Sequence, residues 1–163
     1  MISDTDLRHL RRCVELASEA LAADDEPFGS VLVAGDGHVL AEDRNRVGGG
    51  DRTQHPEFNL ARWAANNMTS EQRAAATVFT SGEHCPMCAA AHGWVGLGRI
   101  VYASSSAQLF KWRTELGAKA APVKGLPIQS VVPEVVVEGP VDELAKQIKA
   151  LHYQFYRLNS STD

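Results

Sequence analysis

The chain has 163 residues, of which 44% are hydrophobic, 22% charged and 7% aromatic. This length suits one domain that buries roughly 68–70% of the surface of its unfolded form, and it argues against a second full domain. Three cysteines and ordinary amounts of proline and glycine exclude a disordered chain, a collagen-like repeat and a disulfide scaffold.

The chain is acidic, with a net charge of −4 and a pI of about 5.8. A protein that binds phosphate backbones usually carries a basic face, so nucleic-acid binding is disfavoured. The N-terminus lacks the basic and apolar regions of a signal peptide, and no apolar stretch approaches the ~20 residues of a membrane helix. An odd number of cysteines fits a reducing compartment. We therefore expect a soluble, cytoplasmic protein without membrane contact.

Hydrophobic periodicity and turn residues predict the elements of the first half of the chain. A helix is expected over residues 3–23, where Ser3 and Asp6 have the spacing of a capping box. A hairpin is expected next, with strands over 30–34 and 39–41. The glycines in the loop over 45–53 follow no phosphate-loop spacing, which favours a flexible connection.

The second half of the chain alternates predicted helices and strands. Helices are expected over 56–67, 86–97, 107–116 and 141–158, strands over 77–81, 99–103 and 135–137, and a loop-rich segment over 117–133. The hairpin implies antiparallel pairing, and the strand–helix–strand units imply parallel pairing. The sequence thus predicts a layered α/β fold with a mixed sheet, in one domain over residues 1–163.

Two short clusters contain the residue types of a metal site. Cys85 and Cys88 have the spacing with which two thiolates hold one zinc ion, and His55 can supply a third ligand. Three protein ligands leave the fourth tetrahedral position open for water, which is the arrangement of a catalytic zinc. Glu57 follows His55 by two residues, and its carboxylate there can accept a proton from that water and pass it on.

A redox motif and a structural zinc site fit the cysteine pair less well than a catalytic zinc does. A thioredoxin-type redox motif needs no His-x-Glu partner upstream. A structural zinc site needs a fourth ligand, but no second Cys-x-x-Cys or histidine pair is present. Cys13, the remaining cysteine, lies near the apolar positions of the first predicted helix, where a buried thiol is expected.

These motifs resemble the zinc-dependent cytidine-deaminase-like superfamily, whose pattern is His-x-Glu followed by Pro-Cys-x-x-Cys. The run Cys85-Pro86-Met87-Cys88-Ala89-Ala90 is similar to the guanine deaminase, cytosine deaminase and tRNA adenosine deaminase branches. The resemblance extends from Pro27 through the closing helix. It implies a three-layer α/β/α fold around a five-stranded mixed sheet, a bound Zn²⁺ and at least a homodimer.

The resemblance also implies a reaction and two substrate contacts. Glu57 would carry protons while a water-derived hydroxyl replaces the amino group of a ring and ammonia leaves. Asn45 matches the family asparagine that hydrogen-bonds the substrate ring. Phe28 would supply a stacking face for a flat heterocycle.

Two positions depart from the family pattern. Pro56 stands where the family usually has a small residue whose backbone N–H contacts a substrate carbonyl, and proline has no N–H. A buried carbonyl without that donor would lose about 1–3 kcal/mol, which favours a ring with an amino group or nothing polar there. His84 replaces the usual proline before the first zinc cysteine. It either contacts the substrate, which we favour, or satisfies a neighbouring carbonyl.

The other histidines are expected to have structural roles or to be exposed. His92 shares a helix face with Cys88, and a packed core histidine is the favoured interpretation. No partner pattern accompanies the remaining three, which are His9, His38 and His152.

Further substrate contacts are suggested by the guanine deaminase branch. Its acidic residue lies about as far beyond the second cysteine as Glu115 does here, and its C-terminal tail closes over a pocket. Glu115 beside Trp112, and Tyr156 in the closing helix, are therefore candidates. The alternatives are a surface carboxylate and an aromatic helix packed on the core. The nearly balanced charge of that helix disfavours a tRNA substrate.

The sequence therefore predicts a zinc-dependent hydrolase that deaminates a small free heterocyclic base, which could be guanine-like, an amino-triazine or a modified base. A tRNA adenosine deaminase or a cytosine deaminase is the alternative within the enzymes. A catalytically silent zinc-binding or partner-binding domain is the alternative of another class, and the presence of Glu57 argues against it.

Overall fold

The computed structural model describes residues 1–160 of the chain. Its helices and strands follow the predicted alternation. In chain order they are α1 (Asp4–Ala22), β1 (Gly29–Val33), β2 (Val39–Arg44), α2 (Pro56–Asn67), α3 (Ser70–Ala75), β3 (Thr77–Gly82), α4 (Pro86–Val95), β4 (Arg99–Ser104), α5 (Ser106–Glu115), β5 (Val137–Glu138) and α6 (Asp142–Ser160). Short 3₁₀ turns, η1 (Val47–Gly49) and η2 (Ile128–Ser130), interrupt two loops.

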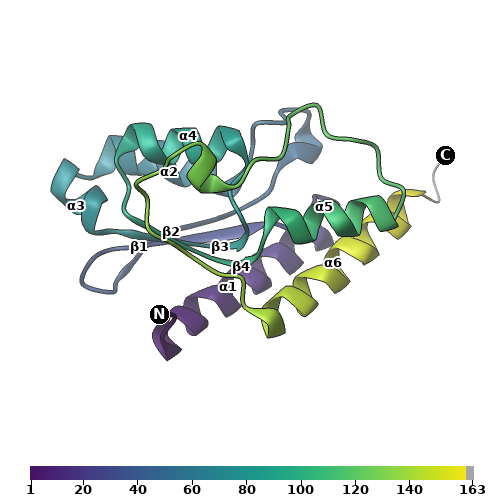
Figure 1. Ribbon diagram of the computed structural model, residues 1–163, viewed down its shortest axis with the longest axis horizontal. Helices are drawn as coiled ribbons and strands as arrows, with labels where there is room; N and C mark the ends of the chain where they lie inside the picture. Colours follow the sequence, from purple (N-terminus) through teal and green to yellow (C-terminus); the bar gives the residue numbers. More distant parts are fainter. Residues whose placement is uncertain (161–163) are drawn as a thin grey trace.

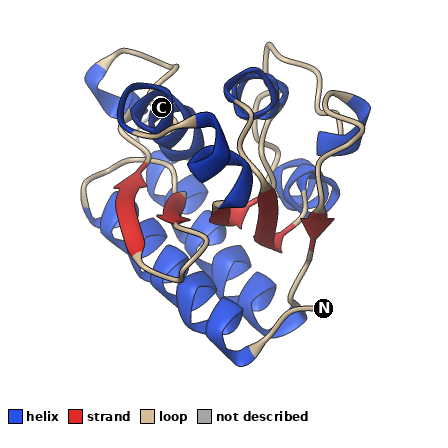
Figure 2. Ribbon diagram, turned by 90° about the vertical axis from the view of Figure 1, so that its left-hand side faces the viewer, coloured by secondary structure: helices blue, strands red, loops and turns tan. Residues whose placement is uncertain are grey.

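The five strands form one mixed sheet in the order β2-β1-β3-β4-β5. β1 runs antiparallel to β2 and β3, whereas the β3–β4 and β4–β5 pairs are parallel. Helices α2, α3 and α4 lie on one side of the sheet, and α1, α5 and α6 lie on the other (Figure 1). Figure 2 shows the strands, in red, between the two sets of helices. The predicted three-layer α/β/α fold is confirmed.

Strand β1 shows how the sheet separates the two faces. Val31 and Val33 pack with α1 and α6 in the larger core cluster, whereas Leu32 packs with α2 in the second. Because strand side chains alternate, Ser30 points to the same side as Leu32, toward α2. A Cβ on Gly29 would lie 2.4 Å from Leu16 Cβ, so only glycine lets α1 approach β1 this closely.

Several details differ from the sequence prediction, including the end of β2, which reaches Arg44 and not residue 41, and the turn η1 in the loop over 45–53. Helix α3 was not predicted, because none of its residues is buried and it therefore lacks an apolar face, although Thr69 and Gln72 form a capping box before it. The predicted bounds of the last strand are wrong. β5 begins at Val137 and not at residue 135, and Val136 is 61% exposed. The segment over 117–133 contains η2, which the sequence prediction lacked. None of the helices within residues 1–160 is long and apolar enough to cross a membrane.

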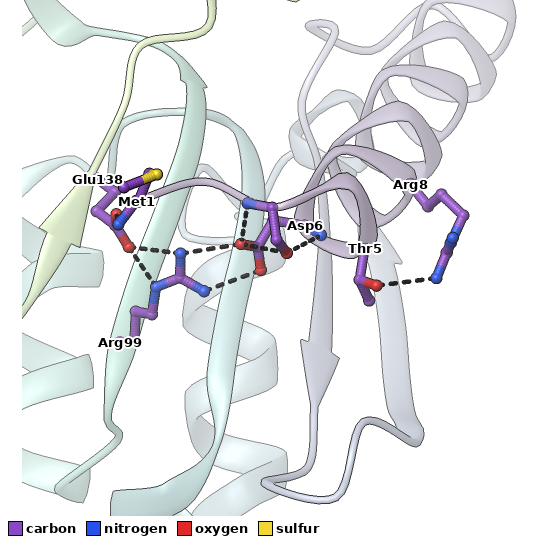
Figure 3. A network of polar contacts seen from close by, with 7 residues as sticks. Met1, Thr5, Asp6, Arg8, Arg99 and Glu138 are labelled. Carbon is purple, nitrogen blue, oxygen red and sulfur yellow. Dashed lines mark hydrogen bonds and ion pairs between the residues drawn. The ribbon is translucent and has the colours of Figure 1, made fainter.

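A polar network joins α1 to the parallel part of the sheet (Figure 3). Arg99 of β4 donates to both carboxylate oxygens of Asp6, at 2.9 and 3.1 Å, and also to Glu138 of β5. The Met1 amino group bonds to the same Glu138 carboxylate. Partial burial opposes ionisation of Asp6, but hydrogen bonds from Arg99 and Ser3 outweigh it and lower the pKa of Asp6 to about 2.

Asp6→Asn is expected to destabilise the protein in a pH-dependent way. The folded-state pKa lies below the ordinary value of 3.8, so the ionised carboxylate stabilises the fold above pH 4 and loses this effect as the pH falls toward 2. The difference in unfolding free energy between wild type and variant should be about 2 kcal/mol at pH 6 and about 1 kcal/mol at pH 3. Denaturant titrations at both pH values measure it, and a difference that does not change with pH would contradict the assignment.

Candidate active site

Three ligand groups meet where two helices begin. His55 is the N-cap residue of α2, Cys85 is the N-cap residue of α4, and Cys88 lies in the first turn of α4. The Cys85 Sγ–Cys88 Sγ distance is 3.5 Å, and His55 Nδ1 is 3.6 Å from each sulfur. Tetrahedral zinc with bonds of about 2.3 Å to sulfur and 2.0 Å to nitrogen places such ligands about 3.5–3.8 Å apart. The three residues therefore fit a zinc ion.

The local sequence explains why the ligands lie at helix starts. Pro56 and Pro86 follow His55 and Cys85 at the first helical positions, where a missing N–H is harmless. The positive end of a helix dipole favours a thiolate there. The hydrogen bond from Cys88, with a further contribution from His55, lowers the pKa of Cys85 to about 4 against the effect of burial. Sharing that proton raises the pKa of Cys88.

Glu57 lies beside this cluster in the first turn of α2 and is only 6% exposed. Its Oε1 atom accepts hydrogen bonds from Thr80 Oγ1 at 2.8 Å and from Ser30 Oγ at 3.1 Å. Burial raises the pKa of Glu57, and the nearby His55 opposes this rise. A buried carboxylate that is not itself among the ligand atoms of the cluster can accept and donate protons next to the metal.

Two predicted substrate residues are neighbours. The backbone N–H of Asn45 donates to the Phe28 carbonyl at 3.0 Å. Asn45 is 2% exposed, and its Oδ1 accepts from the Val47 N–H at 3.0 Å. The Phe28 ring lies beside Gly82, where a Cβ would be 3.0 Å from Phe28 Cε1.

The ring of Phe28 also packs against an aromatic cluster that includes residues of α6. His152, which is 1% exposed, lies edge-on to Phe28 at 4.9 Å between ring centroids. Tyr156 stacks on His152 at 6.5 Å, and Trp112 lies 6.1 Å away on the other helix, α5. The sequence prediction named Tyr156 and Trp112 as substrate candidates and expected a structural or exposed role for His152. Its spacing of four residues from Tyr156 on one helix was the available signal.

Glu26, at the start of the turn into β1, was also missed. Its carbonyl accepts from the Phe28 N–H at 2.8 Å, which closes a tight turn. Burial raises the pKa of Tyr156, and the negative charge of Glu26 raises it further. The same charge contributes to the raised pKa of His55, after the larger effect of the Cys85 hydrogen bond. Glu26 therefore influences both a metal ligand and an aromatic residue of α6 through its charge.

The other two predicted substrate residues have different neighbours. Glu115 is an exposed residue at the end of α5, where it accepts a hydrogen bond from the Tyr153 hydroxyl and lies 3.8 Å from Lys149 Nζ. His84 is 1% exposed and packs edge-on against His92 at 5.4 Å between ring centroids. Neither ring nitrogen of His84 has a hydrogen-bond partner among residues 1–160. The structure thus links Asn45 and Phe28 by a backbone hydrogen bond and joins Phe28 to Trp112 and Tyr156 through His152. His84 directly precedes the ligand Cys85, and the roles of all these residues toward a substrate stay predictions.

Comparisons with known proteins agree with this geometry. The family model for the cytidine and deoxycytidylate deaminase zinc-binding region matches residues 3–104. A probable cytosine deaminase of Schizosaccharomyces pombe is 32% identical over 116 residues, which is 71% of this chain and 70% of that protein. The guanine deaminase of Bacillus subtilis is 37% identical over 97 residues, covering 58% of this chain and 62% of that protein. A tRNA-specific adenosine deaminase of Agrobacterium fabrum is 36% identical over 87 residues, covering 53% and 57%.

Solved structures show the same fold. A guanine deaminase from Nitrosomonas europaea superposes with a TM-score of 0.72 at 20% identity, covering 96% of this chain and 86% of that one. The Bacillus subtilis guanine deaminase structure has a TM-score of 0.57 at 28% identity, covering 77% and 88%. The metal cluster and Glu57 all lie inside the segment matched by the family model. The chain therefore belongs to the cytidine and deoxycytidylate deaminase family and is a zinc-binding, hydrolytic deaminase that acts on a C–N bond.

Proposed function

We propose that the substrate is a small free heterocyclic base that carries amino groups, such as a guanine-like purine, an amino-triazine or a modified base. The observation that carries this proposal is the position of Pro56, which directly follows the ligand His55 at the start of α2. The negative charge of Glu26 acts on the same histidine and on Tyr156. Pro56 offers no N–H to a ring carbonyl, and Glu26 offers a carboxylate to amino or ring N–H groups. Both features favour donors on the ring over a carbonyl.

The chain's own residues account for the reaction. His55, Cys85 and Cys88 would hold a zinc ion, and this ion would lower the pKa of the water that attacks the ring. Glu57 accepts one proton from the attacking water, passes it to a ring nitrogen, and then carries the second to the leaving nitrogen. One water is consumed, the ring carbon exchanges its amino group for a carbonyl, and one ammonia leaves. The Asn45 amide donates to the ring, and Phe28 offers it a stacking face.

Relatives support a free base as the substrate. The two curated relatives named above as cytosine and guanine deaminases act, by their names, on free bases. Structures that superpose on this chain contain 8-azaguanine and 2,6-diaminopurine. Both are free bases with two fused rings and no sugar. 2,6-Diaminopurine carries two amino groups, which suits a site where Pro56 offers no N–H and Glu26 offers a carboxylate.

A tRNA substrate is the second candidate, and one surface feature favours it. One face of α6 carries Tyr153 together with three basic residues, which are Lys146, Lys149 and Arg157. Basic side chains beside an aromatic ring suit a nucleic-acid strand. However, Glu115 lies 3.8 Å from Lys149 and offsets part of this charge, so the free base remains the first candidate.

Ammonia release by the zinc-loaded protein tests the proposal. The panel contains guanine, cytosine, adenine, 2,6-diaminopurine, amino-triazines, their nucleosides where they exist, and an anticodon stem-loop. Turnover is expected on free bases and highest on amino-substituted rings. Turnover on the stem-loop alone would replace the proposal by the second candidate. Silence on the whole panel, with zinc bound, would support a binding domain.

A Pro56→Ala variant tests the substrate preference. Alanine restores a backbone N–H at the first position of α2, so oxo-substituted rings should gain about 1–2 kcal/mol of binding, or about 10-fold in kcat/KM relative to amino-substituted rings. The ratio of the two kcat/KM values in wild type and variant measures the effect. An unchanged ratio would contradict the role given to Pro56.

Two further expectations are part of this proposal, namely a homodimer, which the family resemblance implies, and a cytoplasmic location, which the N-terminus and the cysteine count suggest. Light scattering should give twice the chain mass of 17.7 kDa. A monomeric mass would contradict the dimer, and detection of the tagged protein outside the cytoplasm would contradict the location.

A further inference from the structure

We propose that Thr80 and Ser30 form a pair of positioning residues that fixes the catalytic carboxylate of Glu57 and determines which of its oxygens carries protons. This inference rests on the deaminase activity of the chain and on no particular substrate.

The sheet register brings the two hydroxyl groups together. Ser30 of β1 and Thr80 of β3 are direct partners in the antiparallel β1–β3 ladder. Their hydroxyl oxygens lie 2.9 Å apart. Both residues have no exposed surface, and both side chains reach the Oε1 atom of Glu57 from the sheet. A buried hydroxyl pair beneath a buried carboxylate is therefore built into the fold.

The two hydroxyl groups have only one hydrogen each, which limits the hydrogen bonds that they can donate at the same time. Thr80 lies 2.8 Å from Glu57 Oε1 and 3.0 Å from the Gly82 carbonyl, and donation to a charged carboxylate is the stronger of the two. Ser30 then donates either to Glu57 Oε1 at 3.1 Å or to Thr80 Oγ1, which strengthens the Thr80 bond. In both arrangements Oε1 is held from the sheet.

This arrangement leaves Oε2 as the proton carrier. Oε1 of Glu57 is the acceptor of both hydroxyl contacts, and neither hydroxyl bonds to Oε2. A carboxylate fixed through one oxygen cannot rotate about its last bond without breaking these contacts. Its other oxygen is thus held in one orientation, and the reaction needs no reorganisation of the carboxylate at each proton transfer.

Isosteric variants test the roles of the two hydroxyls. Thr80→Val keeps the side-chain shape and should lower kcat by about 10- to 100-fold, with KM changed by less than about threefold, since orientation and not binding is lost. Ser30→Ala should lower kcat by about 3- to 10-fold, because one donor remains. Thr80→Ser keeps the hydroxyl and should recover most of the wild-type kcat.

Ser104→Ala is the matched control. This buried serine on the neighbouring strand β4 donates to the Ser81 carbonyl at 2.8 Å and makes no hydrogen bond to Glu57. Its kcat should stay within about twofold of wild type, because loss of a buried hydroxyl away from the reacting groups affects stability first. A Thr80→Val enzyme with wild-type kcat, or with a raised KM and unchanged kcat, would overturn the proposal.

A second measurement does not depend on finding the substrate. In a double-mutant cycle, Thr80→Val should lower the melting temperature of the zinc-loaded protein by about 3–6 °C, and by at least about 2 °C less when Glu57 is already alanine. Additive shifts would overturn the contact itself. Coupled shifts in a protein that deaminates nothing on the panel would keep the contact and reject the proposed substrate class.

Discussion

Glu57→Gln is expected to abolish deamination while leaving the zinc content unchanged. Glutamine keeps the side-chain shape, and its carbonyl oxygen can still accept from Thr80 and Ser30, but it cannot carry protons at neutral pH. General acid–base catalysis contributes about 10²–10⁴-fold, and Glu57 acts in more than one transfer, so kcat should fall by at least about 10³-fold. Ammonia release, together with metal analysis of the same sample, measures both effects.

Glu42→Gln is the control for this variant. Glu42 lies on β2, accepts hydrogen bonds from Arg12 and makes no contact with the metal ligands. Its removal should change kcat by less than about twofold, as is usual for surface pairs. A Glu57→Gln enzyme that keeps a tenth of the wild-type rate, or one that loses its zinc, would contradict the assigned role.

His55→Ala is expected to remove the zinc and, with it, much of the thermal stability. The zinc content should fall from about one ion per chain to less than about a tenth, because two thiolates without the imidazole form an incomplete site. If zinc is present at about 1,000 times its dissociation constant, it contributes about 4 kcal/mol to stability. For a chain of this length the loss corresponds to a fall in melting temperature of about 8–16 °C.

Cys13→Ala provides the comparison for the ligand variant. Cys13 has no exposed surface, packs in the main core between α1 and the sheet, and is not part of the ligand cluster. This variant should keep the full zinc content, whatever its effect on core packing. A His55→Ala protein that still binds one zinc ion with unchanged melting temperature would show that the imidazole is not a ligand.

The metal cluster was predicted well because each of the motifs that supply its ligands is a few residues long. Each signal lies within a short segment of the chain. These signals are the spacing of Cys85 and Cys88, the two prolines at the helix starts and the buried strand β3. The ligand atoms of His55, Cys85 and Cys88 were expected to meet, and they lie within 4.8 Å of one another.

The contacts around Glu57 could not be predicted in the same way. Ser30 and Thr80 are fifty residues apart and meet only through the register of β1 and β3. No local pattern determines which strands pair or in what register, so no feature of the sequence indicated that these two polar residues would meet. The serine at a fully buried strand position was the only available signal.

The substrate residues show the opposite difficulty. Glu115 was named from its distance in sequence beyond Cys88; it lies at the end of α5, exposed beside Tyr153 and Lys149, and its role toward a substrate stays a prediction. Sequence distance fixes spatial position only where the intervening backbone is the same. His152 carried no motif, and its burial follows from how α6 packs across the sheet.

The family model ends at residue 104, and α5 and α6 both lie beyond it. The proton carrier and the metal ligands therefore belong to one part of the chain, and His152, Trp112 and Tyr156 belong to another. Exchanging the segment after Ser104 between relatives should therefore change the aromatic neighbours of Phe28 and leave the metal ligands and Glu57 in place. The two helices that follow β4 can thus vary in sequence without altering the residues on which cleavage of the C–N bond depends.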